Sequence, residues 1–459
     1  MKPTTKGRRR RRGRPRAPHL WALLALLVAG SACATYSDRN LAAREALRRG
    51  DATGAELELN ELLGVESSRD LPAKFGSETA LTLLERATVL QAKGAYQLSA
   101  RDFTAAEKDL ELLDIANDTA GEIGKYVFSD DATKYKTSPT EKLHINALNM
   151  INYLALGDLA GARVEARRFQ VMRKYLTDHF PDEPHGVFGS YLAGFVFEKS
   201  GDAETALRHY DEVLRQVDVP ALYEPVQRLA ARSPFRTPRI ERVLAKARTV
   251  PASHGDEATG EILVILKTGT VPAKQAARIP IGAALGLAAH YVSGDTKILE
   301  YGMFKVVSYP ELLPHADVFT GGTLRVGEKS VSMAPLSDVA AEVKAEYEKL
   351  KPKIVGAALS RMIVRAASAE AARAAGNRQS GALGFLAAAL VEGTLVAMDK
   401  PDTRSWSMLP ARIHIARIEV PAGTHRVRMD LHGRSSASLE RTVEVPAGGF
   451  AVVDFTTLR

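Results

Sequence analysis

The pattern of small and large apolar residues predicts helical hairpins in the first half of the chain. In four segments a glycine is followed by a small residue five positions later and mostly by larger or apolar residues nine and twelve positions later. The four sets are Gly50/Ala55/Leu59/Leu62, Gly94/Ser99/Phe103/Ala106, Gly157/Ala162/Ala166/Phe169 and Gly201/Ala206/Tyr210/Val213. The glycine can end one helix in a left-handed conformation, the small residue lets the next helix approach, and the later positions share its inner face.

This turn and second helix resemble those of the tetratricopeptide repeat (TPR), which has a period of about 34 residues. The glycines here are spaced by 44, 63 and 44 residues, so the hairpins are expected to be separated by insertions, the longest around residues 119–140. We therefore predict a TPR-like α-solenoid over residues 33–218. A plain irregular helical bundle is the alternative.

The pattern changes after this region. Five prolines between Pro220 and Pro251 predict a linker over residues 219–258. Short β-forming runs at 261–267, 277–281 and 304–308 then predict strands of a small sheet. Helical spacing returns over 338–375 with an interruption at Pro352, and residues 382–398, apolar apart from Glu392, predict a buried helix. Residues 259–400 are thus expected to form a mixed β/α domain.

The last segment, residues 401–459, repeats a strand–turn–strand pattern. Glu419-Val-Pro-Ala-Gly423 and Glu444-Val-Pro-Ala-Gly448 stand 25 residues apart, each before a second β-rich run. The pattern resembles the small β-sandwich modules of the PEGA type found on bacterial surface proteins. The fold class is therefore predicted as multidomain, α plus α+β: an N-terminal TPR-like α-solenoid, a mixed β/α region and a small C-terminal β-sandwich.

The N-terminus predicts export and lipidation. A basic run ending at Arg16 precedes an apolar stretch from Leu20 to Ala29 and then Gly30-Ser31-Ala32-Cys33. Ten apolar residues span only about 15 Å as a helix, too short to cross a bilayer, so residues 1–32 are predicted to be a signal peptide. Cys33, the one cysteine of the chain, resembles the acylated residue of a lipoprotein signal. With Ala34 after it, the resemblance to bacterial sorting rules favours the outer membrane.

Composition and charge exclude several classes of protein. A hydrophobic content of 45% and a charged content of 25% are typical of globular domains, which excludes global disorder and a polytopic membrane protein. The net charge of +8 arises in the signal region, where nine basic and no acidic residues stand before Cys33. The rest of the chain has 53 basic and 54 acidic residues, so no nucleic-acid partner is expected. Arg12-Gly13-Arg14-Pro15 matches the core of a minor-groove-binding AT-hook but adjoins the apolar stretch and is interpreted as part of the signal.

A partner-binding surface is predicted where amides and charges recur on two consecutive predicted helices. Amides at three-residue spacing could pair with the backbone of an extended peptide, or they could join this helix to its neighbours. The charges of the second helix could contact a partner or form a solvated face. The candidate residues are Asn146, Asn149, Asn152, Tyr153, Arg163, Glu165, Arg167 and Arg168.

Catalytic chemistry is not indicated by any motif for a zinc protease, a serine hydrolase or a phosphate loop. The best metal candidate is the cluster of imidazoles and carboxylates His179, Asp182, Glu183 and His185. The alternative for this cluster is an acidic connector before the fourth hairpin. No cofactor is expected.

Several segments together resemble a family of TPR-containing bacterial envelope lipoproteins. They include Ile151–Asp158, Gly161–Arg168, Gly260–Val264 and Asp402–Trp406 with Leu409-Pro410. The resemblance implies location and architecture and no reaction; the long arginine-rich start departs from it. The sequence therefore predicts a lipid-anchored, non-enzymatic scaffold that binds a protein partner in the cell envelope. The alternatives are a regulator of a cell-wall or polysaccharide synthase and, in another class, a metal-dependent hydrolase using residues 178–185; the sequence leaves the oligomeric state open.

Overall fold

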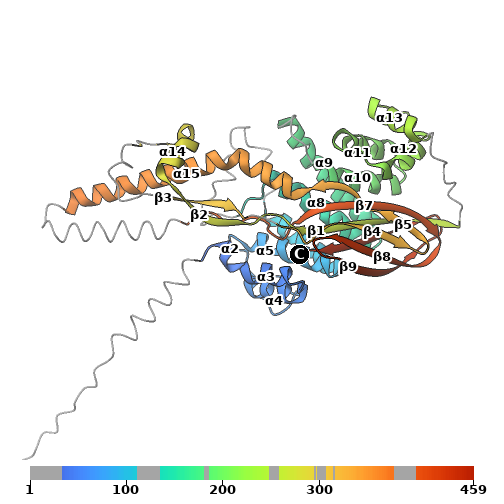
Figure 1. Ribbon diagram of the computed structural model, residues 1–459, viewed down its shortest axis with the longest axis horizontal. Coiled ribbons are helices and arrows are strands. Elements are labelled where there is room, and N and C mark those ends of the chain that lie inside the picture. The colour runs from blue at the N-terminus through green and yellow to red at the C-terminus, as the bar shows by residue number, and fades with distance from the viewer. Residues whose placement is uncertain are drawn as a thin grey trace, which may run out of the picture.

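The computed structural model describes residues 34–110, 135–179, 186–247, 258–293, 296, 306–313, 316–376 and 400–459. A helical first half is followed by a strand-rich second half, which confirms the predicted fold class (Figure 1). The helices of the first half are α2 (Tyr36–Arg39), α3 (Leu41–Arg48), α4 (Ala52–Leu63), α5 (Thr79–Ala92), α6 (Tyr96–Asp109), α8 (Pro139–Ala155), α9 (Leu159–His179), α10 (Val187–Lys199) and α11 (Ala203–Gln216).

The four predicted hairpins are present, each with its glycine between two helices. Gly50, Gly94, Gly157 and Gly201 have φ of 81°, 78°, 73° and 81°, in the left-handed region that glycine adopts without strain. The small residue five positions after each glycine is fully buried. In the first hairpin Leu62 is exposed and Leu63 is buried in its place. The helices pack closely because small residues face large ones: a Cβ on Gly194 of α10 would lie 2.5 Å from the Tyr210 ring of α11.

The segment expected to be a proline-rich linker contains helices as far as residue 247. These are the short helix η2 (Pro220–Leu222), α12 (Tyr223–Ala230) and α13 (Pro238–Ala247). Pro220 and Pro238 begin helices, where proline's missing N–H needs no acceptor. Asp211 of α11 accepts hydrogen bonds from Arg239 and Thr237, both at 2.5 Å, so α13 is joined to the fourth hairpin. Residues 248–257 lie outside the described part of the chain.

The strand-rich half is built on two four-stranded sheets. One has the order β10-β1-β7-β6 and the other β5-β4-β8-β9. The strands are β1 (Thr259–Thr270), β4 (Phe319–Val326), β5 (Lys329–Ser332), β6 (Ala334–Asp338), β7 (Pro410–Pro421), β8 (Gly423–Gly433), β9 (Ala437–Val445) and β10 (Phe450–Thr457). The β4–β6 strands were not predicted from the sequence.

The two segments expected as separate domains, 259–400 and 401–459, both contribute strands to each sheet. β1 pairs in parallel with β10 and antiparallel with β7, and β4 pairs with β8. The physical reason is the apolar run Ile262–Leu266, which is buried at every position. A strand apolar on both faces must be covered on both sides and flanked by other strands.

Alternate residues of the first sheet face two different layers. Leu263, Ile265 and Val452 belong to the core shared with the helices, whereas Ile262, Val264 and Val453 belong to the core between the sheets. The period of two along a strand produces this alternation. The result is three layers, with helices, a first sheet and a second sheet (Figure 1).

A third unit, here called the arm, extends from the base of the sandwich (Figure 1). It comprises β2 (Lys274–Pro280), α14 (Ile281–Ala288), η3 (Ala289–Tyr291), β3 (Val306–Leu312) and α15 (Val339–Gly376). β2 and β3 form an antiparallel pair, and α15 continues through Pro352, where an interruption was expected. The helix predicted over 382–398 lies outside the described residues. Among the helices described, none is long and apolar enough to span a bilayer.

The hairpin packing predicts a contrast between two alanines of α11. Ala206 is fully buried at the crossing with α10, while Ala203 at the turn is only partly buried. Ala206→Leu should lower the stability of the chain 34–459 by about 1–3 kcal/mol through overpacking, and Ala203→Leu by less. Thermal melts of the two variants against the parent measure this. Equal melting of the Ala206→Leu variant and the parent would contradict the hairpin geometry.

Candidate functional site

The face of the helical repeats formed by α5 and α8 is covered by another part of the same chain. The segment Asp402–Pro410 runs against α5 and α8 before β7 begins. Trp406 is fully buried; its indole N–H donates to Thr88 Oγ1 at 3.0 Å, and its backbone N–H donates to Glu141 Oε1 at 2.7 Å. The Trp406 ring also packs against Phe103 of α6, with 5.8 Å between centroids.

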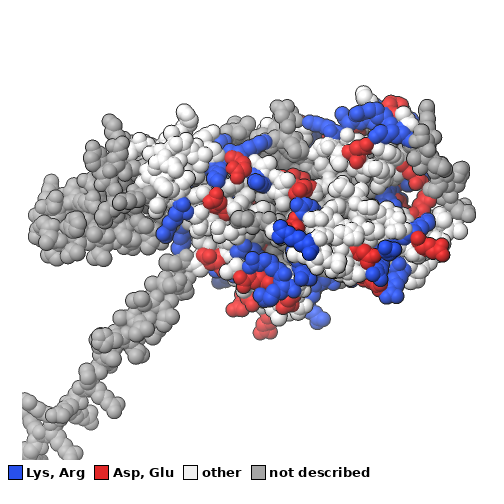
Figure 2. All heavy atoms as spheres, in the orientation of Figure 1, with Lys and Arg blue, Asp and Glu red and all other residues white. Residues whose placement is uncertain are grey.

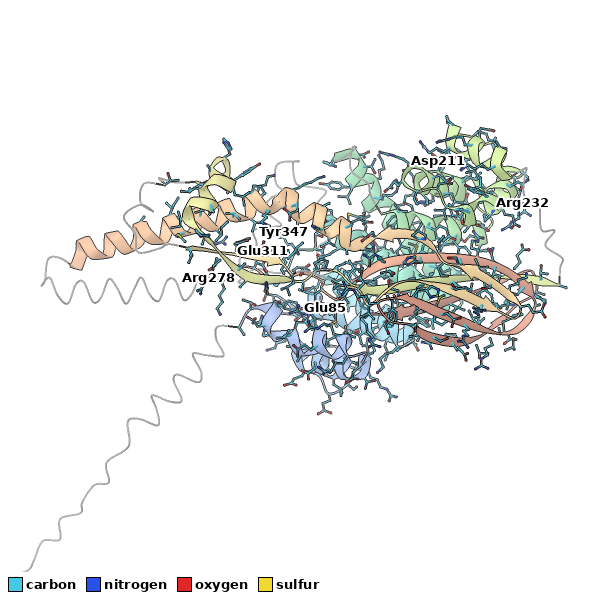
Figure 3. The ribbon with its side chains drawn as sticks, viewed as in Figure 1. Glu85, Asp211, Arg232, Arg278, Glu311 and Tyr347 are labelled. Atoms are coloured by element: carbon cyan, nitrogen blue, oxygen red, sulfur yellow. The ribbon has the colours of Figure 1, made fainter. Side chains whose placement is uncertain are left out.

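Glu85 of α5 is the principal acceptor for this segment (Figure 3). Its carboxylate accepts the backbone N–H of Ser407 at 2.9 Å, the Ser407 hydroxyl at 2.8 Å and the backbone N–H of Met408 at 2.7 Å. Asn40 adds a fourth donor at 3.1 Å. Burial raises the pKa of Glu85 to about 7, while the hydrogen bonds from Ser407 and Met408 oppose that rise.

A second polar group connects the helices to the edge of the first sheet. Lys267 of β1 is fully buried, forms an ion pair with Asp454 of β10 at 3.1 Å and donates to Gln91 of α5. Burial lowers the pKa of Lys267 and raises that of Asp454, and each charge opposes the shift of the other. Gln91 in turn donates to Asn152 Oδ1 at 2.7 Å, which extends the hydrogen bonds from the sheet into α8.

A third group lies at the other end of the same interface. Arg417 of β7 donates to Glu198 of α10 at 2.7 Å and to Glu261 of β1 at 2.8 Å, and Lys199 also pairs with Glu261. Although burial acts to raise them, the Arg417 charge holds the pKa of Glu261 at about 2 and that of Glu198 lower still. Both carboxylates therefore stay ionised at neutral pH.

The three predicted amides lie inside the protein. Asn152 donates to Ser99 and Asn149, and Asn146 donates at 2.8 Å to both Glu107 and Glu165. Burial, and then the neighbouring Glu107 charge, raise the pKa of Glu165 to about 7. The amides thus join α8 to its neighbours, the second of the two predicted roles.

The basic residues predicted on the second helix occupy the outer face of α9. Arg163 and Arg167 are exposed and, within the described chain, form no ion pair. Arg168 differs, because it pairs with Glu107 at 2.7 Å and with Glu165 at 3.2 Å. Tyr153 is half-buried near the preceding turn, where a Cβ on Gly161 would lie 2.5 Å from its ring.

Two exposed valines accompany the arginines of α9. Val164 is 48% exposed and Val171 is 65% exposed, which is unusual for side chains of this size on a helix that buries its other face. Positions 163, 164, 167 and 171 lie along one side of a helix because they are separated by three, four and seven residues. The outer face of α9 therefore combines exposed apolar area with the positive charge of Arg163 and Arg167.

A cavity of about 920 Å³ lies between α15, β3 and the edge of the first sheet. Its charged lining residues are of both signs: Glu311, Asp317, Asp338, Glu348, Lys344, Arg412 and Arg434. Arg412 forms ion pairs with Asp317 and with Asp338, so opposite charges in the lining partly compensate each other. The lining thus has no single sign of charge that would select a charged ligand.

The remaining predicted sites fall mostly outside the described residues. Cys33 and the metal candidates Asp182, Glu183 and His185 are among those not described. His179 ends α9, where its ring stacks on Tyr175 with 4.1 Å between centroids and its Nδ1 lies 2.8 Å from the Tyr175 carbonyl oxygen. In the described part of the chain, no cluster of three or more His, Cys, Asp or Glu side chains could hold a metal ion.

No protein-family model matches the chain, and no curated protein does. Among solved structures, the chain is similar to a tetratricopeptide repeat protein from Parabacteroides merdae, with 14% identity over 48% of this chain and 94% of that one. The TM-score of that superposition is 0.16.

The residues that organise this interface were missed by sequence reasoning. Glu85 lies in the apolar helix α5 and has no motif around it. The available signal was in the strands, where Glu261, Lys267, Arg417 and Asp454 interrupt otherwise apolar runs. All four are in register with residues that face the helices, such as Leu263 and Val452. A charge at such a position predicts a partner in the next layer.

The role of Glu85 predicts a large loss on truncation. Glu85→Ala leaves the buried N–H groups of Ser407 and Met408 without an acceptor, at a cost of about 3–5 kcal/mol. Glu45→Ala is the matched control, since Glu45 is exposed and pairs only with Arg48. Urea unfolding of the chain 34–459 measures both. The account of Glu85 fails if the two variants unfold at the same urea concentration.

Proposed function

We propose that the protein is a lipid-anchored, non-enzymatic scaffold of the bacterial cell envelope that binds a protein partner through the outer face of α9. The observation that carries this proposal is the pairing of Val164 and Val171 with Arg163 and Arg167 on an exposed helix face. Exposed apolar area beside arginines without an ion pair in the described part of the chain is typical of contact surfaces, where both residue types contribute to binding.

The position of the bound segment Asp402–Pro410 supports the choice of this face. TPR-like repeats offer a peptide groove, but here Glu85 and Glu141 already accept the backbone N–H groups of Ser407 and Trp406, and Thr88 accepts the Trp406 indole N–H. A partner that competed for this groove would have to displace the fully buried Trp406. The outer face of α9, the longest of the second helices with 21 residues, is exposed at Arg163, Val164, Arg167 and Val171.

The charge of the α9 face indicates the chemistry of the partner. An acidic helix or strand with apolar residues at matching spacing would pair with Arg163 and Arg167 and cover both valines. The protein could in this way regulate a cell-wall or polysaccharide synthase, and the synthase would then be the partner that supplies the acidic surface.

The partner surface is tested by reversing its charge. Arg163→Glu with Arg167→Glu should weaken partner capture at least about ten-fold, because attraction to an acidic surface becomes repulsion. A photo-crosslinker at position 171 in intact envelopes measures capture, with the adduct identified by mass spectrometry. Arg48→Glu with Arg49→Glu is the matched control, two exposed arginines at the last residue of α3 and just after it. An adduct of equal yield in the reversed variant and the control would exclude the α9 face.

The anchor is tested separately at Cys33. Cys33→Ala removes the thiol that would be acylated, so metabolic labelling with a fatty acid should be lost and the signal left uncleaved. Fractionation of the envelope shows where the variant is found. If the variant is cleaved and stays in the membrane as the parent does, the protein is not a lipoprotein.

A further inference from the structure

The arm presents apolar side chains to solvent at the end that carries α14. The helix Ile281–Ala288 contains no polar side chain, and Leu287 on it is 40% exposed. Tyr291 of η3 is 48% exposed and Val364 of α15 is 64% exposed. In Figure 2 the surface over α14 is free of acidic and basic side chains.

The exposed apolar residues and their basic neighbours on α14, η3 and α15 are here called the α14 patch: Ala283, Leu287, Tyr291, Lys353, Arg361 and Val364. Residues 283 and 287 are one turn apart on α14, and Tyr291 ends η3, which follows α14 directly. η3 packs directly on α15, because a Cβ on Gly356 would lie 2.6 Å from the Cβ of Tyr291. The Lys353 ammonium lies 6.0 Å from the Tyr291 ring centroid, and Val364 lies about three turns further along α15.

The charged residues nearest the α14 patch in sequence are basic, and the exposed Glu348 of α15 lies further back along that helix. The sequence has no Asp or Glu at residues 262–294 or 349–369, the stretches that supply β2, α14, η3 and the middle of α15. The acidic residue of β3, Glu311, already accepts a hydrogen bond from Tyr309 at 2.6 Å and pairs with Lys351 at 3.1 Å. Arg278, by contrast, is exposed on β2 (Figure 3).

The basic residues of the arm do not converge on a point. Arg278 lies on the two-stranded sheet, whereas Lys353 and Arg361 lie on α15 beside α14. A single carboxylate or phosphate would need donors that converge on it. Dispersed positive charge around an apolar helix fits an extended negative surface better, and a bilayer with anionic headgroups is such a surface.

The start of the described chain lies at the same end of the molecule. α2 packs against β2, so the start of the described chain lies beside the two-stranded sheet of the arm (Figure 1). A lipid on residue 33 would therefore bring the arm close to the bilayer.

We propose that the α14 patch binds the surface of a membrane that contains anionic lipids, with Leu287, Tyr291 and Val364 in the headgroup region and the basic residues of the arm against the lipid phosphates. The proposal builds on the proposed envelope location, but its binding energy comes from the arm and not from Cys33. Apolar side chains and dispersed basic residues would both contact the lipids. Binding should therefore increase with the content of anionic lipid and decrease with ionic strength.

The chain 34–459, which cannot be acylated, tests this directly. It should co-sediment with vesicles of phosphatidylcholine and phosphatidylglycerol, bind vesicles of phosphatidylcholine alone far more weakly, and dissociate at high salt. Leu287→Asp with Tyr291→Asp should lower the partition coefficient about ten-fold or more, because two apolar contacts become charges of the wrong sign. Lys353→Glu with Arg361→Glu should lower it too and reduce its salt dependence.

Leu57→Asp is the matched control, since Leu57 is 61% exposed on α4, outside the arm; it should bind vesicles as the parent does. Circular dichroism confirms that each variant is folded. The proposal is overturned if the parent does not bind anionic vesicles, or if the Leu287→Asp/Tyr291→Asp variant binds them as well as the Leu57→Asp control. It is also overturned if the parent forms a dimer that binds no vesicles and the Leu287→Asp/Tyr291→Asp variant is a monomer, because the α14 patch would then be a dimer interface. Because Cys33 is absent from this chain, these outcomes are independent of lipid labelling and of partner capture by α9.

Discussion

The carboxylate of Glu85 fixes the position of the strand-rich half on the helical half. It accepts two backbone N–H groups and one hydroxyl from Ser407 and Met408, and β7 begins at Pro410 immediately afterwards. β7 then pairs with β1 over its whole length, and β1 pairs with β10. An extended segment held on the repeats therefore sets the register of the first sheet against the helices. The two halves also share one hydrophobic core, to which the helices and strands β1, β7 and β10 all contribute.

Apolar contact and buried charge have different roles in that interface. Leu263, Ile265 and Val452 share a core with the helices, and their burial supplies the favourable free energy of association. The ion pairs of Lys267 with Asp454 and of Arg417 with Glu198 gain less, since desolvation offsets most of their attraction. Their effect is on geometry: a shift of β1 by one residue would move Lys267 to the face between the two sheets. The buried charges thus specify one register of the sheet on the helices.

The parts of the fold that could be predicted from the sequence are those determined by near neighbours. The four hairpins follow from a glycine and the residues five to twelve positions after it, and α15 follows from its helical spacing. The strand pairing could not be predicted in this way, because paired residues such as Glu261 and Phe450 are far apart in the sequence. The two Pro-Ala-Gly turns suggested a separate C-terminal module, although one of the strands they join pairs with β4 and another with β1. Glu85 could not be found either, since a carboxylate with backbone partners more than three hundred residues away leaves no local pattern.

The filled groove limits where this protein can bind other molecules. In an open solenoid the first helices of the hairpins would be available, and the amides Asn149 and Asn152 would be their natural contacts. Here Asn152 is committed to Ser99, Asn149 and Gln91, and Glu85 to Ser407 and Met408. A ligand there would have to replace the protein's own hydrogen bonds with equally good ones, at no net gain. Favourable binding of another molecule is therefore expected at surfaces that do not already hold a segment of this chain. The outer face of α9 and the α14 patch are two surfaces of this kind; they lie on different elements, so one can face a protein partner while the other faces a membrane.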